Sequence, residues 1–157
     1  MMPLPARVTG DPLRLVLLAI AAVTVVTGAC QLIAPGPVLR LLATGPDDPS
    51  ALSLHFFATV GMFMVVVGGL LAQQLLTREA PGFPLLWVGL QKFGAFALVT
   101  VGVARGLLIA AALLVALFDL ATAGLCGLLW RRGRRWLAGV VGQTPKDRAG
   151  AGGQGMR

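Results

Sequence analysis

The sequence predicts an all-α integral membrane protein, a bundle of four transmembrane helices with both termini in the cytoplasm. Of its 157 residues, 57% are hydrophobic and only 12% are charged, and the mean hydropathy is +0.85. A soluble domain carries about 25% charged residues, so this chain has too little polar surface to fold in water. Four apolar runs of membrane-spanning length and an uneven distribution of arginine complete the prediction. Two cysteines are too few for a disulfide scaffold.

The first two spans are predicted over residues 13–34 and 51–76. Asp11 and Pro12 open the first span as a cap acceptor and a proline at the first helical position, and prolines follow its end. An Asp48-Pro49 pair precedes the second span in the same way. Each run supplies the roughly 20 apolar residues that a helix needs to cross a hydrocarbon core of about 30 Å.

The last two spans are predicted over 84–103 and 107–130, as a tight hairpin that reverses at Arg105. A single helix over both runs would rise about 70 Å, more than twice the core thickness. The four spans assign residues 1–134 to one membrane domain. The tail 135–157 is basic and rich in glycine, so we expect it to be flexible. The loop 35–50 is apolar enough for part of it to lie on the membrane surface.

Orientation follows from the basic residues near the span ends, because lysine and arginine are retained on the cytoplasmic side. The side that holds both termini carries nine of them, namely Arg7, Arg14, Arg78, Arg131, Arg132, Arg134, Arg135, Lys146 and Arg148, whereas the opposite side carries Arg40 and Arg105. Both termini are therefore predicted to be cytoplasmic. Eleven of the thirteen basic residues are arginine, and alanine, glycine and proline are abundant. This bias is typical of GC-rich coding, which favours a bacterial plasma membrane.

The basic cluster after the fourth span is predicted to contact anionic lipid headgroups. It comprises Arg131, Arg132, Arg134, Arg135 and Trp136. Each basic residue near an anionic surface contributes about 1 kcal/mol of attraction. A stop-transfer and orientation signal is the alternative interpretation and does not exclude the first. The net charge of +7 does not predict nucleic-acid binding, because the excess lies in juxtamembrane positions that orientation already explains.

An intramembrane ion pair between Lys92 and Asp119 is the most specific prediction. Both residues lie deep in their spans, and ionisable groups in lipid are costly unless they are paired, hydrated or near the interface. A hairpin that reverses at Arg105 places positions whose numbers sum to about 210 side by side, which brings 92 next to 119. Small residues on the same face as Asp119, such as Ala116 and Ala123, permit close helix approach. In the alternative, Lys92 snorkels to the surface and Asp119 is protonated.

A second polar group gathers towards the outer surface, where Gln31, His55 and Arg105 are predicted to border one shallow site with the acidic residues of the 35–50 loop. His55 is the only histidine, so it is a candidate for a proton-linked switch. A local hydrogen bond at the interface is the alternative role for His55.

The sequence predicts no catalytic residue, metal site or cofactor. One histidine cannot give bis-histidine haem ligation, and no His, Cys, Asp or Glu cluster has metal-ligand spacing. Cys30 and Cys126 fall near opposite ends of their spans, too far apart for a disulfide. A lipidated Cys30 after the Thr27-Gly28-Ala29 run is an alternative that would leave three spans.

The arrangement resembles the DoxX-like group of small bacterial four-helix membrane proteins. The resemblance covers about residues 13–130 and rests on Gly28, Gln31, Leu32 and Pro35 at the end of the first span, Gly61, Gly68 and Gly69 in the second, Gly89, Lys92, Phe93 and Gly94 in the third, and Phe118-Asp119-Leu120 in the fourth. It implies a four-helix bundle, and some members are linked to quinone-dependent oxidoreductase assemblies.

Taken together, these patterns favour a non-enzymatic structural or accessory subunit of a membrane complex. Its expected partners are the lipid bilayer, a membrane protein or a second copy of the chain. An oligomeric proton- or solute-coupled transporter is one alternative, because four helices alone seldom enclose a transport pathway. A membrane subunit of a quinone-linked oxidoreductase is the other.

The predicted topology is tested by reporter fusions at three positions. Fusions at Arg78 and Gln143 should report the cytoplasm and a fusion at Asp48 the outer side, because basic residues near span ends stay inside. Any other pattern contradicts the four-span topology. A mature protein that begins at Cys30 would instead support the lipidated alternative.

Overall fold

The computed structural model describes residues 11–44, 49–77 and 82–141, with side chains up to Arg134. All five elements in these ranges are α-helices: α2 (Pro12–Ile33), α3 (Pro35–Leu42), α4 (Ala51–Leu76), α5 (Phe83–Ala104) and α6 (Ala112–Val141). The helices α2, α4 and α5 and the Ala112–Arg134 part of α6 are long and apolar enough to cross a membrane. The predicted all-helical chain with four candidate spans is confirmed over the described residues.

The first two spans begin at different kinds of cap. Asp11 accepts a hydrogen bond from the Leu13 amide at 3.0 Å and Pro12 is the first residue of α2, as predicted. In α4 the cap is Ser50, whose hydroxyl accepts from the Ser53 amide at 3.1 Å. The prediction of an Asp-Pro entry into the second span was therefore wrong. Ser50 is closer to the helix and its hydroxyl satisfies a free amide of the first turn; Asp48 lies outside the described residues.

The turn between the last two spans occurs at Arg105, as predicted, but the fourth helix begins at Ala112 instead of Leu107. Gly106 adopts a φ of +71°, which favours glycine, and reverses the chain. The Ile109 amide then donates to the Leu42 carbonyl at 2.9 Å, and Ala43 and Leu108 form an isolated bridge. The apolar residues at 107–111 suggested a helix, whereas Leu107 bonds back to Gly102 of α5 and Ile109 bonds to the last residue of α3.

Two further boundaries differ from the sequence prediction. The helix α6 continues to Val141, so residues 135–141, which the sequence prediction placed in the tail, are helical. Arginine and leucine are good helix formers, and they sustain the helix beyond the apolar span; residues 142–157 lie outside the described part. The apolar stretch of the 35–50 loop forms the short helix α3, which begins at Pro35 and packs against α2 and α4.

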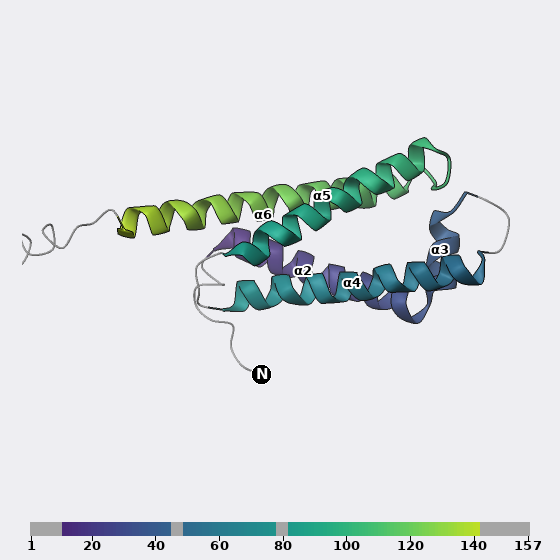
Figure 1. Cartoon of the computed structure of the whole chain (residues 1–157), viewed down its shortest axis with the longest axis horizontal. Coiled ribbons are helices and arrows are strands. Elements are labelled where there is room, and N and C mark those ends of the chain that lie inside the picture. Colours follow the sequence, from purple (N-terminus) through teal and green to yellow (C-terminus); the bar gives the residue numbers. More distant parts are fainter. Residues whose placement is uncertain (1–10, 45–48, 78–81, 142–157) are drawn as a thin grey trace, which may run out of the picture.

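The helices pack as two antiparallel pairs, α2 with α4 and α5 with α6 (Figure 1). The two pairs meet mainly at the end where α2 begins and α4 ends, here called the terminal end. Buried side chains from all four long helices form the core there, namely Leu17, Ala21, Leu71, Leu75, Leu85, Val88, Cys126 and Leu129. The other end, which holds α3 and the turn at Arg105, is called the turn end. The core therefore fastens the two pairs together at one end of the bundle.

Within the first pair, α2 and α4 approach most closely at Gly28 and Gly61. A Cβ atom added to Gly28 would lie 2.7 Å from the Gly61 carbonyl oxygen, and one added to Gly61 would lie 2.6 Å from the Gly28 carbonyl oxygen. Both residues are buried. Side chains larger than hydrogen do not fit between these backbones, so the two glycines set the spacing of the pair.

This contact predicts the effect of one added methyl group. Gly28→Ala should lower the free energy of unfolding by about 1–3 kcal/mol, because the new Cβ meets backbone atoms that cannot move aside. Gly69→Ala is the matched control on α4, since nothing lies within 4 Å of its added Cβ. Thermal unfolding in detergent, monitored by circular dichroism, measures the stability of both variants. Equal melting temperatures for the two variants would contradict the close approach.

Candidate functional site

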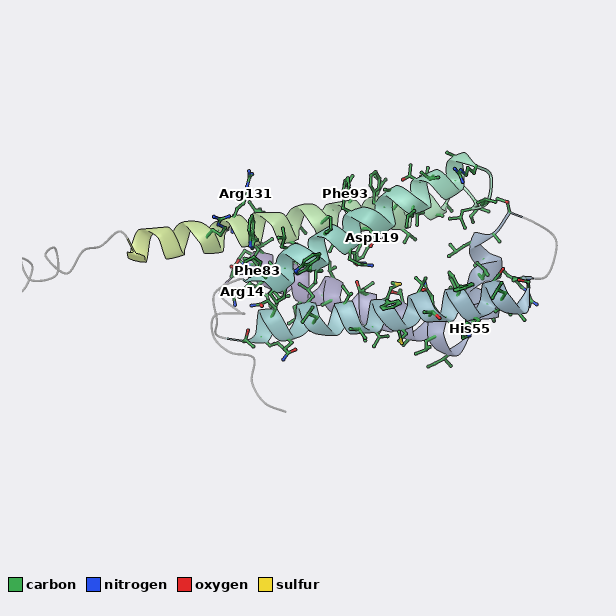
Figure 2. The ribbon with its side chains drawn as sticks, in the orientation of Figure 1. Arg14, His55, Phe83, Phe93, Asp119 and Arg131 are labelled. Atoms are coloured by element: carbon green, nitrogen blue, oxygen red, sulfur yellow. The ribbon has the colours of Figure 1, made fainter. Side chains whose placement is uncertain are left out.

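The structure places Lys92 and Asp119 in direct contact inside the bundle. Lys92 Nζ on α5 lies 2.6 Å from Asp119 Oδ1 on α6, and the two residues are 2% and 6% exposed. This is the contact that the hairpin register predicts. Lys92 does not extend to the surface, so the snorkelling alternative is not the arrangement found. Figure 2 shows Asp119 on the side that faces the α2–α4 pair, with Phe93 on the outer side of the bundle.

Small residues bring α5 and α6 close enough for this contact. A Cβ added to Gly89, one turn before Lys92, would lie 3.4 Å from Cys126 Cβ and 3.5 Å from the Ala123 carbonyl oxygen. Ala116, one turn before Asp119, is fully buried. Where side chains are this short, opposing backbones approach and the longer side chains of the pair can meet.

The pair compensates for its own burial. A single charge at the centre of a span costs about 2.5–3.5 kcal/mol by insertion scales. Contact between ammonium and carboxylate offsets that cost, and Lys92 Nζ also lies 5.7 Å from the centroid of the Phe118 ring, within the range of cation–π attraction. Only one of the three ammonium hydrogens is needed for the bond to Asp119 Oδ1. The pair therefore keeps hydrogen-bonding capacity for a further group.

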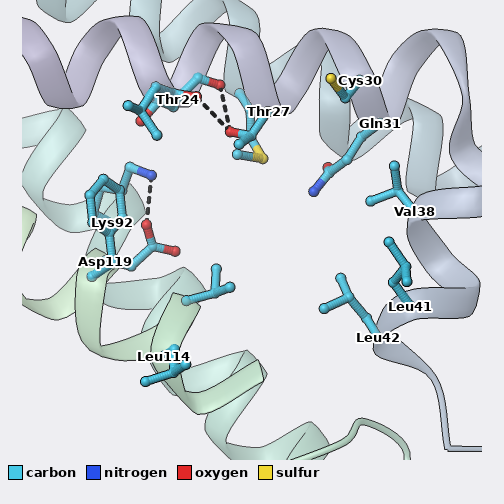
Figure 3. Close-up of a pocket in the computed structure, with 14 residues that line it drawn as sticks. Thr24, Thr27, Cys30, Gln31, Val38, Leu41, Leu42, Lys92, Leu114 and Asp119 are labelled. Carbon is cyan, nitrogen blue, oxygen red and sulfur yellow. Dashed lines mark hydrogen bonds and ion pairs between the residues drawn. The ribbon is translucent and has the colours of Figure 1, made fainter. Parts of the chain in front are cut away.

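A partly open pocket of about 460 Å³ lies next to the pair and extends towards the turn end (Figure 3). Its volume is within the range of about 300–1,000 Å³ found for small-molecule sites. Most of the wall is apolar, and Lys92 and Asp119 supply its charged part. All five helices contribute to the lining, which comprises Val23, Thr24, Thr27, Cys30, Gln31, Val38, Leu41, Leu42, Met64, Lys92, Leu114, Val115, Phe118 and Asp119.

Polar residues of α2 face the pair across this pocket. Thr24 is 2% exposed and its hydroxyl oxygen has no hydrogen-bond partner, and the same holds for the buried side-chain oxygen of Gln31. Thr27 differs, because its hydroxyl donates to the Val23 carbonyl of its own helix at 2.8 Å. Thr24 and Thr27 were not among the site residues predicted from the sequence. Thr27 and Gln31 follow Thr24 by three and seven residues, a spacing that places all three on one face of a helix. This spacing was the available sequence signal.

The structure does not bring the predicted outer polar group together in this pocket. Gln31 lines the pocket, whereas His55 and Arg105 are exposed and are not part of its lining. The His55 ring lies 6.2 Å from that of Phe56, and its carbonyl accepts a bond from Thr59 at 3.0 Å. The depth of His55 along its span could be predicted from the sequence. The rotation of α4 about its axis, which leaves His55 outside the pocket wall, could not. The acidic residues of this group, Asp47 and Asp48, lie outside the described residues.

The predicted headgroup cluster lies at the terminal end, where Arg131, Arg132 and Arg134 are exposed on α6. The Arg134 guanidinium lies 5.1 Å from the centroid of a Trp130 ring, within the range of cation–π attraction. The side chains of Arg135 and Trp136 are outside the described part, and contact with lipid stays a prediction.

The two cysteines lie in different parts of the bundle. Cys30 is exposed and lines the pocket, whereas Cys126 is buried in the core, and both are free thiols. Within the described ranges, no three His, Cys, Asp or Glu residues are grouped so as to hold a metal ion.

The ion pair predicts a coupled effect of two substitutions. Lys92→Ala or Asp119→Ala alone should lower the free energy of unfolding by about 3–5 kcal/mol, because each leaves the partner unpaired among apolar residues. Lys92→Leu combined with Asp119→Leu should recover most of that loss, since packed apolar groups replace a buried pair well. Chemical unfolding in detergent measures all variants. Losses that simply add in the double-mutant cycle would show that the two residues do not interact.

Comparisons with known proteins were made in three ways. No protein-family model matches the chain, and neither the curated proteins nor the solved structures give a match. The resemblance to the DoxX-like group therefore stays a prediction, and a functional proposal has to be based on the pocket and its residues.

Proposed function

We propose that this protein is a non-enzymatic accessory component of a membrane complex and that it binds one small amphipathic molecule in the pocket beside Lys92 and Asp119. The observation that carries the proposal is a charged pair that forms part of the wall of an otherwise apolar, partly open pocket. Binding pockets for small molecules commonly combine an apolar wall with a few polar groups that fix the orientation of the ligand.

Unsatisfied polar atoms support an occupied pocket. A buried hydroxyl or amide oxygen without a hydrogen bond costs about 1–3 kcal/mol, and this wall contains two such atoms, on Thr24 and Gln31. Lipid tails cannot satisfy them. The polar head of an amphipathic molecule can, while its apolar part contacts side chains such as Val38, Leu41 and Leu114.

The proposed location is a bacterial plasma membrane, with the terminal end of the bundle on the cytoplasmic side. Exposed arginines of α6 at that end support this orientation. The Lys92–Asp119 pair would then lie within the hydrocarbon layer, and the pocket would extend from it towards the outer leaflet, where a membrane amphiphile can enter from the side.

A proton- or solute-coupled transporter that acts as an oligomer is the second candidate, and one observation favours it. A buried acid and base that both face a cavity are the kind of groups found along ion pathways. A single bundle of four spans does not itself enclose such a pathway, so this candidate requires more than one copy of the chain. A monomer would argue against it.

Native mass spectrometry of the protein released from lipid nanodiscs tests the proposal. The wild type should retain one small amphipathic molecule, and Val115→Trp should lose it because the larger ring fills the pocket. Leu117→Trp is the matched control, since Leu117 is exposed on the same helix and is not part of the pocket wall. The same spectra report the number of chains and any bound partner protein or quinone. Equal retention by Val115→Trp and Leu117→Trp would contradict binding in this pocket.

A further inference from the structure

We infer that the head of the bound molecule is uncharged and both donates and accepts hydrogen bonds, as the hydroxyl groups of a monoacylglycerol do. This inference deepens the proposed function and depends on it. It follows from the charges and the hydrogen-bonding groups that line the pocket beside Lys92. Neither the apolar part of the wall nor the pocket volume distinguishes between kinds of head; only the polar groups of the wall do.

The paired charges of the site oppose a head that carries charge of a single sign. Lys92 and Asp119 carry opposite charges and both line the pocket, so the wall has no net charge there. A phosphate or carboxylate attracted by Lys92 would meet the Asp119 carboxylate, and an ammonium attracted by Asp119 would meet Lys92. Within the bundle this repulsion is only weakly screened, and a charge without its own partner is expensive to bury.

Hydrogen-bonding capacity then selects the kind of uncharged head. Lys92 offers ammonium hydrogens beyond the one that bonds Asp119, whereas the Gln31 side-chain amide and the Thr24 hydroxyl each offer both a donor and an acceptor. Figure 3 shows Thr24 on α2 facing Lys92 and Asp119 across the pocket, with Gln31 further along the same wall. A ketone or ester head can only accept, so it would leave the acceptors of this wall unsatisfied. A hydroxyl head satisfies donors and acceptors at once.

The free thiol of Cys30 provides the readout, because it lines the same pocket and is exposed. Cys126 is the internal control, since it is buried in the core and is not part of the pocket wall. The full-length protein in phosphatidylcholine nanodiscs is treated with N-ethylmaleimide, and the alkylation of each cysteine is followed by peptide mass spectrometry. A bound molecule should slow the reaction of Cys30 and leave that of Cys126 unchanged.

Four probes with the same oleoyl or oleyl chain length distinguish the heads. They are 1-oleoylglycerol, its 3-phosphate, methyl oleate and oleylamine, which present an uncharged diol, an anion, an acceptor-only ester and a cation. We expect 1-oleoylglycerol to slow Cys30 alkylation about tenfold when present at roughly ten times its dissociation constant. The other three should leave the rate within about twofold of that without a probe, because each lacks a hydrogen-bonding function or carries a charge.

A pair of threonine variants links this effect to the pocket wall. Thr24→Val preserves shape and removes the unpartnered hydroxyl, so it should reduce protection by 1-oleoylglycerol severalfold. Thr100→Val is the matched control, because the Thr100 hydroxyl bonds the Phe96 carbonyl of its own helix at 2.8 Å and Thr100 does not line the pocket. Equal protection of Cys30 in the two variants would show that the Thr24 hydroxyl does not contact the bound head, and would overturn the inference.

The remaining outcomes separate this inference from the proposed function. Protection of Cys30 by methyl oleate, the phosphate or oleylamine as strong as that by 1-oleoylglycerol would show a pocket that binds amphiphiles without selecting an uncharged hydroxyl head, and would overturn the inference alone. If none of the four probes slows the alkylation of Cys30, and Cys126 is alkylated equally slowly in every sample, both the inference and the proposed function are overturned.

Discussion

The contact between Lys92 and Asp119 constrains the rest of the bundle because neither charge is stable alone in a hydrocarbon layer. It fixes the register of α5 against α6, since a slip of one residue would turn the two side chains away from each other. It also requires short side chains beside it, and Gly89 and Ala116 occupy those positions. The α5–α6 hairpin is thus held by a polar bond at mid-depth and by close backbone packing around it.

The other hairpin is held differently, and the contrast explains where the pocket lies. Gly28 and Gly61 allow α2 and α4 to touch through their backbones, and at the terminal end the Arg14 guanidinium donates to the Leu75 carbonyl at 3.4 Å. The two hairpins then share an apolar core only towards the terminal end, around Leu17, Leu75 and Leu129. Towards the turn end, α3 and the polar face of α2 line a pocket instead of interlocking with α6. The apolar core and the pocket therefore lie towards different ends of one bundle.

Much of this arrangement was predictable from the sequence, and the exceptions have physical causes. Apolar length defined the spans, and a reversal at Arg105 was enough to pair Lys92 with Asp119. Hydropathy could not show that Ile109 bonds to Leu42 at the end of α3, because that contact is made by backbone groups. Nor could it give the rotation of α4 that leaves His55 outside the pocket, since nearly every position on that helix is apolar. Thr24 was overlooked because one hydroxyl barely changes the hydropathy of a span.

Solid-state NMR on the protein in lipid bilayers tests the central claim most directly. Lys92 and Lys146 are the only lysines, so Lys146→Arg leaves Lys92 as the single source of a side-chain ¹⁵N lysine signal. Rotational-echo double-resonance between that nitrogen and ¹³C-labelled aspartate carboxyl carbons should show strong dephasing, as expected for Nζ lying 2.6 Å from a carboxylate oxygen. The dephasing should disappear in a further Asp119→Asn variant, which lacks the labelled carboxyl group. Absence of dephasing in the Lys146→Arg protein would contradict a direct Lys92–Asp119 contact and, with it, the pocket built around that pair.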